Sequence, residues 1–309
     1  MMSSVIRLLL LLPVLSVLVG CSKTALLYDN ADWMATRWVS TLLDPDGHQE
    51  DQWGEMFGEV LQRHRLELLP EFVSLLAELE QRADGGLSTA FLDCWLDAAD
   101  GSYRRHAQLL IPTAVDVLLQ LRPAQIDHLE AALEERNDEY REEMLFADPA
   151  EQREARVDRY VDRVERWTGA LDVEQREWFA RQVERLPDVA ASWLAYRQRQ
   201  QRDLVALLRS GPTATSLRDY LEAWWLRFDH RPPQLESDIA SLRGRMVQLL
   251  GELDQRLAPR QRQHLAARIR DLREGLASVA GPVNPVVARD ERVPCGDRLS
   301  AASAVAQTR

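Results

Sequence analysis

Cys21 is the residue whose chemistry is easiest to interpret, because it stands at the end of a secretory signal pattern. Arg7 supplies a positive start, residues 8–19 form a mostly apolar run, and the small Gly20 precedes the thiol. The run is too short to cross a bilayer as a helix, so residues 1–20 indicate a cleaved signal peptide. A small residue lets a peptidase approach, and the Cys21 thiol is a nucleophile that can accept a lipid. We therefore expect cleavage between Gly20 and Cys21 and lipid attachment at Cys21. The alternative is an ordinary signal peptide that ends in a chance cysteine.

The Leu-Val-Gly-Cys ending of this segment resembles a bacterial lipoprotein box. The resemblance implies that the Cys21 thiol receives a diacylglycerol and that the freed amine is acylated as well, for example with palmitate. Several chains together hold a protein on a bilayer, where one chain alone is marginal. Ser22 follows the cysteine, and by resemblance to the sorting rules of Gram-negative bacteria a residue other than Asp there favours the outer membrane. Residues 21–29 would then be a lipidated linker on the periplasmic face of the outer membrane. The alternative is that the protein is anchored in the inner membrane.

The other two of the three cysteines, Cys94 and Cys295, allow two interpretations. Cys94 lies beside Trp95 on an apolar helical stripe, and Cys295 lies in a stretch rich in Pro and Gly. An oxidising periplasm would let the two cysteines pair. The alternative is two unpaired thiols, one buried and one in a tail. Three cysteines are too few for a disulfide-built scaffold or a Cys-rich zinc protein.

Residue patterns that would indicate catalysis, metal binding or nucleic-acid binding are absent from the sequence. It has no Gly-x-Ser-x-Gly elbow, no phosphate-binding Gly-rich loop and no His-Glu-x-x-His. The 6 histidines are scattered, and no two of them are four residues apart. A net charge of −11 disfavours binding to phosphates. We therefore expect no enzyme, no cofactor, no metal ion and no nucleic-acid partner.

The elements that must position these residues are helices. Apolar side chains recur at i, i+3, i+4 and i+7 along most of the chain, as in amphipathic helices. Residues 53–68 form one such stripe, which ends at Pro70, and residues 217–228 form the most regular one. No stretch alternates in the manner of a strand. The sequence predicts an all-α, multi-helix bundle, which could be elongated, over residues 30–280, followed by a disordered tail at residues 281–309.

A degenerate five-residue repeat marks three of the expected helix starts. Each copy is Leu-x-(Pro or Val)-x-Gln, with apolar residues four and eight positions past the Gln. Pro fits the first helical position because no amide hydrogen bond is lost there, and a Gln at the third position can reach back to the cap amide. We expect the leading Leu to pack onto the bundle. The motif residues are Leu121, Pro123, Gln125, Leu171, Gln175, Leu257, Pro259 and Gln261.

These copies resemble the Leu-Thr-x-x-Gln motifs of the Spy and CpxP periplasmic proteins, although no Thr occupies the second position here. Those are helical envelope-stress proteins, one of them a chaperone for unfolded clients. A second resemblance covers more of the chain. The residues that carry it are 21–33, 162–167 and 171–175, with Trp193, Arg197 and Gln200. They are similar to an uncharacterised proteobacterial lipoprotein family, domain of unknown function 6279. This resemblance implies a lipoprotein with a helical fold, and no activity or catalytic residue comes with it.

The expected partners are the bilayer, through Cys21, and proteins of the periplasm. The repeat and the charge-rich stretch 134–166 favour a non-catalytic protein-binding module on the outer membrane, chaperone-like or part of an envelope-stress response. The alternative is a structural envelope lipoprotein that binds a fixed protein partner or peptidoglycan. Carriage of a hydrophobic ligand between helices is a further hypothesis, and a large apolar cavity would be its sign. Trp33 and Trp38 could rest on the membrane interface or pack into the bundle.

Overall fold

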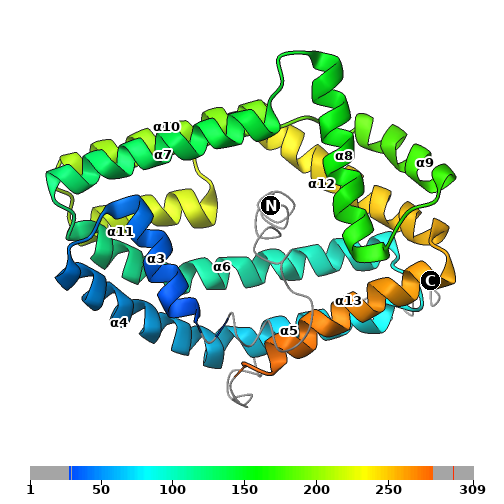
Figure 1. Cartoon of the computed structure of the whole chain (residues 1–309), viewed down its shortest axis with the longest axis horizontal. Coiled ribbons are helices and arrows are strands. Elements are labelled where there is room, and N and C mark those ends of the chain that lie inside the picture. The colour runs from blue at the N-terminus through cyan, green and yellow to red at the C-terminus, as the bar shows by residue number, and fades with distance from the viewer. Residues whose placement is uncertain (1–27, 29, 281–294, 296–309) are drawn as a thin grey trace, which may run out of the picture.

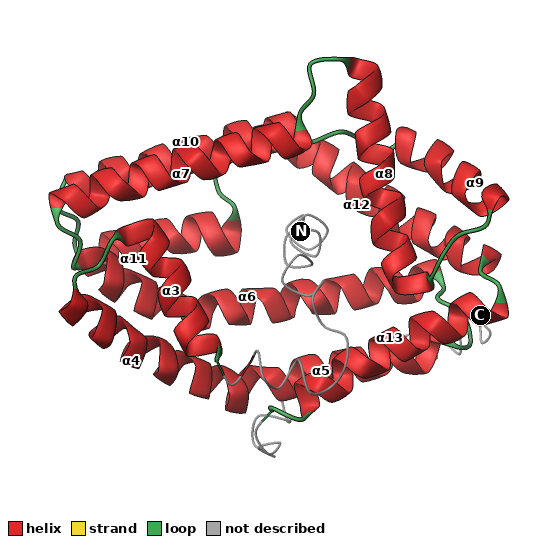
Figure 2. Ribbon diagram, viewed as in Figure 1, coloured by secondary structure: helices red, strands yellow, loops and turns green. Residues whose placement is uncertain are grey.

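The computed structural model describes residues 28, 30–280 and 295, and within these residues all regular structure is helical (Figure 2). The all-α prediction is therefore confirmed. The predicted signal peptide, residues 1–20, lies outside the described residues. So do residues 21–27 and 29 of the predicted linker and all of the predicted tail except Cys295.

The chain forms two successive sets of helices, divided at the loop of residues 145–148. The first set is α3 (Ala31–Leu43), α4 (Gly47–Arg63), the π-helical turn η1 (His64–Leu68), α5 (Leu69–Ala83), α6 (Thr89–Leu119) and α7 (Pro123–Met144). The second set is α8 (Pro149–Thr168), α9 (Val173–Glu184), α10 (Ala190–Arg209), α11 (Ala214–Glu222), the π-helical turn η2 (Ala223–Arg227), α12 (Pro233–Arg256) and α13 (Pro259–Ala277).

The two sets are related by an approximate two-fold arrangement, in which each set contributes one helix to the other. α5 of the first set packs against α13 of the second, and α10 of the second packs against α7 of the first. In the same way α3 packs against α7 and α8 packs against α13, while α6 contacts both α11 and α12. Together the helices trace a flattened, elongated ring, with α7 and α10 along one long side and α5 and α13 along the other (Figure 1).

Pro70 does not end the helix that precedes it, contrary to the expectation from its apolar stripe. In η1 the amide of Leu69 donates to the carbonyl of His64, five residues back, so the helix is widened just before the proline. A proline inside a helix removes an amide donor and crowds the carbonyl four residues earlier, and a π turn relieves that crowding. At η2 the helix does end, because Phe228 adopts the left-handed conformation with φ of 58°.

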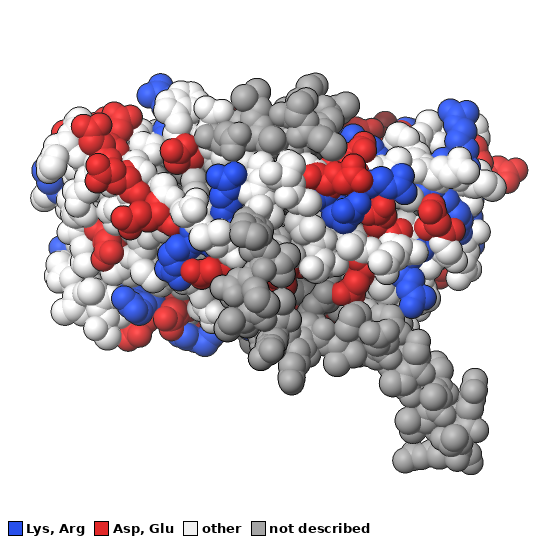
Figure 3. All heavy atoms as spheres, turned by 90° about the horizontal axis from the view of Figure 1, so that it is seen from below, with Lys and Arg blue, Asp and Glu red and all other residues white. Residues whose placement is uncertain are grey.

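The hydrophobic core includes three large clusters, two of which join helices of both sets. One cluster lies among α8, α9, α10 and α12 around Phe179 and Tyr196. Another lies among α3, α4, α6, α7, α10 and α11 around Trp53 and Leu217. A third joins α5 and α6 to α12 and α13 around Trp95. Outside the core, acidic and basic side chains are interspersed, as the face drawn in Figure 3 shows.

Candidate functional site

The glutamines of the repeat hold pairs of interhelical turns together. Gln125, at the start of α7, exchanges side-chain hydrogen bonds with Gln49, at the start of α4. Gln125 Nε2 donates to Gln49 Oε1 at 2.8 Å, and the return bond is 3.4 Å long. Each Oε1 also accepts from the backbone amide that caps its own helix, at Arg122 or Asp46. Each Nε2 donates in addition to a backbone carbonyl of the opposite turn. We call this the first glutamine pair.

The second glutamine pair repeats the arrangement in the other set of helices. Gln175, at the start of α9, and Gln261, at the start of α13, donate to each other at 2.9 and 2.8 Å. Their Oε1 atoms accept from the cap amides of Asp172 and Ala258, and their Nε2 atoms reach carbonyls of the opposite turn. The first pair thus ties the α3–α4 turn to the α6–α7 turn. The second ties the α8–α9 turn to the α12–α13 turn, and its glutamines are 86 residues apart in sequence.

The remaining motif residues occupy the local positions that the repeat predicts. Pro123 and Pro259 are the first residues of α7 and α13. Leu171 and Leu257 are buried, and Leu121 is half-buried. The motif therefore starts helices, as expected, and its leucines pack onto the bundle.

Gln49 is the member of these pairs that the motif does not reveal, because Pro45 stands where the other copies have Leu. Its signal is the spacing of Asp46 and Gln49, which form a complete capping box with each other's backbone amides. The pairing itself follows only from the fold. Because the side-chain amide groups of these glutamines are hydrogen-bonded within the protein, we assign them a structural role in joining the turns and not a role in binding a partner.

Cys94 and Cys295 form a disulfide, so the first of the two interpretations holds. Their Cα atoms are 5.9 Å apart, although 201 residues separate them in sequence. Cys295 is fully buried, and its amide donates to the carboxylate of Glu78 on α5. The predicted tail is therefore attached to the helical body at this residue.

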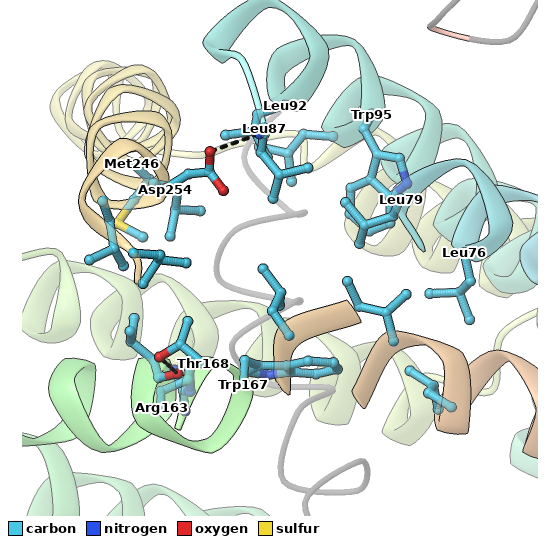
Figure 4. A pocket seen from close by; sticks show the side chains of 18 of the residues that line it. Leu76, Leu79, Leu87, Leu92, Trp95, Arg163, Trp167, Thr168, Met246 and Asp254 are labelled. Carbon is cyan, nitrogen blue, oxygen red and sulfur yellow. Dashed lines mark hydrogen bonds between the residues drawn. The ribbon is translucent and has the colours of Figure 1, made fainter. Parts of the chain in front are cut away.

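An apolar pocket lies between α5, α6, α8, α12 and α13 (Figure 4). Its volume is about 260 Å³. The apolar residues that line it include Leu76, Leu79, Leu87, Leu92, Trp95, Trp167 and Met246. The side chains that bring polar groups to it include Tyr160, Arg163, Thr168 and Asp254. Such a pocket is the sign that the hydrophobic-ligand hypothesis requires.

Two of these polar groups are bonded within the protein. The carboxylate of Asp254 accepts from the amide of Leu87 at 2.9 Å and from the guanidinium of Arg262 at 2.7 Å. Gly86 makes room for this approach: its φ is +103°, and a Cβ there would lie 3.3 Å from Asp254 Oδ2. Thr168 donates to the carbonyl of Val164, one turn earlier on α8. Both side chains, those of Asp254 and Thr168, therefore already have hydrogen-bond partners within the protein.

The helices that correspond to those around the pocket under the two-fold arrangement enclose part of a buried apolar cluster. Under the two-fold arrangement, α5 corresponds to α10, α8 corresponds to α3 and α13 corresponds to α7. The start of α6 corresponds to α11, and α12 corresponds to the end of α6. Leu217 and Leu221 of α11 are fully buried there, in the same cluster as Val205 and Leu208 of α10.

A family model matches residues 41–225, more than half of the chain. The matched stretch includes Gln49, Gln125 and Gln175 and three of the helices that surround the pocket. The description of the matching family is "family of unknown function (DUF6279)". The chain belongs to this family. The resemblance to it in the sequence is thereby confirmed, although segment 21–33 lies before the matched residues. No curated protein and no solved structure matches the chain.

This DUF6279 chain also holds two neighbouring histidines, His64 in η1 and His106 in α6, with ring centroids 4.9 Å apart. The hydroxyl of Tyr28 lies 2.5 Å from Nδ1 of His64. Burial, together with the nearby His106, lowers the pKa of His64 to about 4, and burial lowers the pKa of His106 as well. Both rings are therefore neutral at pH 7. In the described part of the chain, no group of three or more His, Cys, Asp or Glu could hold a metal ion.

α3 presents large apolar side chains to solvent in this member of DUF6279. Trp33 is 66% exposed and Trp38 is 60% exposed, and Met34 between them is also exposed. Of the two alternatives for these tryptophans, packing into the bundle is therefore wrong. Exposed apolar neighbours of this kind mark interaction surfaces. Of the described helices, none is both long and apolar enough to cross a membrane.

Proposed function

We propose that the mature protein is a lipoprotein held on the periplasmic face of the outer membrane through Cys21, and that it binds an apolar molecule without transforming it. The apolar pocket between α5, α8 and α12 is the observation that carries the binding function. A lipid on Cys21 would keep this pocket close to a bilayer, which is a source of apolar molecules.

The size of the pocket favours a ligand. Engineered apolar cavities cost about 24 cal/mol per Å³ of lost packing. On that scale a volume of 260 Å³ corresponds to at most about 6 kcal/mol that an apolar occupant could recover. An apolar occupant would fill this volume and restore those packing contacts.

Two observations support the proposed location. Disulfides form in oxidising compartments such as the periplasm, and Cys94 pairs with Cys295. Trp33 lies twelve residues past Cys21 and is exposed together with Trp38. Tryptophan side chains favour the interface between lipid and water, so α3 would rest against the bilayer that Cys21 enters.

Chaperoning of unfolded clients has less support than ligand binding and stays a prediction. The repeat and the charge-rich stretch 134–166 favour it, but Gln125, Gln175 and Gln261 of the repeat bond inside the protein. Binding of a fixed protein partner or of peptidoglycan likewise has less support than ligand binding and stays a prediction.

The pocket is tested with a neutral fluorescent probe, N-phenyl-1-naphthylamine, and the soluble Ser22–Arg309 chain, which retains every described residue. We expect saturable binding of the probe. Leu265→Trp should weaken probe binding about tenfold, because the larger indole ring would occupy part of the pocket volume that the probe fills. The matched control is Leu207→Trp, a half-buried leucine on α10 outside the pocket, which should bind the probe like the wild type. Lack of saturable binding, or equal binding by both variants, would refute the ligand-binding proposal.

The anchor is tested by labelling cells with a palmitate analogue. The wild-type chain should be labelled and should sediment with outer membranes. Cys21→Ala should lose the label and the membrane association, since no other residue offers a thiol at the cleavage site. Ser22→Asp is the control, which should keep the label but move to inner membranes. Equal labelling of the wild type and Cys21→Ala contradicts the anchor.

A further inference from the structure

α8 brings two hydrogen-bond donors to one wall of the pocket. Tyr160 and Arg163 are about one turn apart on α8, and both line the pocket. Arg163 lies beside Thr168, across the pocket from Trp95 (Figure 4). A phenol and a guanidinium therefore adjoin an otherwise apolar space.

Neither donor is bonded within the described protein. No hydrogen bond or ion pair joins the guanidinium of Arg163 or the hydroxyl of Tyr160 to any described residue. Two more deeply buried arginines differ in this respect. Arg156 donates to two backbone carbonyls, and Arg243 donates to the carboxylate of Asp93. This chain thus supplies partners to arginines buried in its core, whereas Arg163 is left with its donors facing the pocket.

The surroundings of Arg163 favour an anion. Burial lowers the pKa of Arg163, as expected for a cation that has lost water without gaining a carboxylate. Arg166 and Arg159 add positive charge, and Glu143 acts more weakly. Burial raises the pKa of Tyr160, so its hydroxyl stays protonated and can donate. An anion at this wall would accept from both groups and replace the solvation that they have lost.

We propose that the pocket binds a fatty acid, whose carboxylate accepts hydrogen bonds from Arg163 and Tyr160 and whose chain lies among the leucines of α5, α12 and α13. This inference rests on the proposed function and names its ligand class. Asp254, on the α12 wall, is already paired with Arg262 and does not oppose an anion.

The volume of the pocket fits one acyl chain. At 260 Å³ it exceeds the roughly 150 Å³ apolar cavity that takes benzene. It is smaller than the roughly 300 Å³ at which pockets for drug-sized ligands begin. A lipid with two chains and a large headgroup is therefore disfavoured, and a single chain with a compact carboxylate is the anion that matches both the shape and the charge.

The test is competition for the N-phenyl-1-naphthylamine site by three molecules with the same chain length. Laurate carries a carboxylate, 1-dodecanol is neutral and dodecylammonium is a cation. We expect laurate to displace the probe at concentrations about tenfold lower than dodecanol, since hydrogen bonds between charged partners are among the stronger ones. Dodecylammonium should be the weakest competitor, because it would face Arg163.

The variants separate charge recognition from binding in general. Arg163→Gln should weaken laurate about tenfold and should change the affinities for the probe and for dodecanol much less. The control is Arg153→Gln, an exposed arginine on α8 that does not line the pocket, which should change none of the three affinities. Equal affinities of laurate and dodecanol, or full laurate affinity in Arg163→Gln, would overturn the fatty-acid assignment while the probe still binds. Failure of the probe to bind the wild type would instead overturn the proposed function.

Discussion

Loss of the Cys94–Cys295 disulfide is expected to lower the free energy of unfolding by about 3–5 kcal/mol. The bond closes a loop of 201 residues, which contains most of the helical body, so it removes much conformational freedom from the unfolded chain. Cys295 is also fully buried, and its amide donates to Glu78. Without the bond, ordering this contact would have to overcome the entropy of a free end.

Urea unfolding of Ser22–Arg309 with and without dithiothreitol measures this effect. The reductant should shift the midpoint of the wild-type chain to lower urea concentration. The Cys94→Ala, Cys295→Ala double variant should match the reduced wild type and should not respond to the reductant. An oxidised wild type no more stable than the double variant would show that the disulfide does not stabilise the fold.

Replacement of Gln175 by Leu is expected to cost about 2–4 kcal/mol of stability. Its side chain makes hydrogen bonds to the cap amide of Asp172, to the carbonyl of Arg256 and, in both directions, to Gln261. Leucine has a similar size and can make none of these bonds. The cap amide, the carbonyl and the amide of Gln261 would each lose a partner at a site that excludes much of the solvent, which is more costly than the loss of an exposed hydrogen bond.

A double-mutant cycle with Gln261→Leu tests whether the two glutamines act as a pair. The double variant should lose less stability than the sum of the single variants, because the second substitution removes a side chain that is already unsatisfied. Gln248→Leu on α12 is the control: its side chain is exposed, and we expect a change within about 0.5 kcal/mol. Additive losses in the cycle would mean that the second pair does not couple the two turns.

The helices were predictable because their signals are local. Apolar spacing follows from the 3.6-residue period, and Pro123 and Pro259 mark helix starts because proline costs nothing at the first position. Pro70 shows the limit of such reasoning. The same residue can end a helix or be accommodated by a π turn, and here η1 continues directly into α5 while it contacts α6.

The candidate site was predictable only in part. The repeat indicates that Gln125, Gln175 and Gln261 share a role, whereas nothing local in the sequence shows that an apolar cavity forms. Arg163 had no distinguishing feature in a stretch with many charged residues. It stands out only once α8 lies against α12 and α13, where its guanidinium meets a pocket instead of a carboxylate.

The sequence by itself determined the all-α class, the helix starts at the repeat and the expectation of a lipid on Cys21, because each of these depends on residues close together in the chain. The tertiary structure alone decided that Gln175 bonds Gln261, that Cys94 bonds Cys295 and that an apolar pocket forms between α5, α6, α8, α12 and α13. These features join residues that are far apart in sequence. Many combinations of amphipathic helices satisfy the same local periodicity, and only their packing brings such residues within bonding distance.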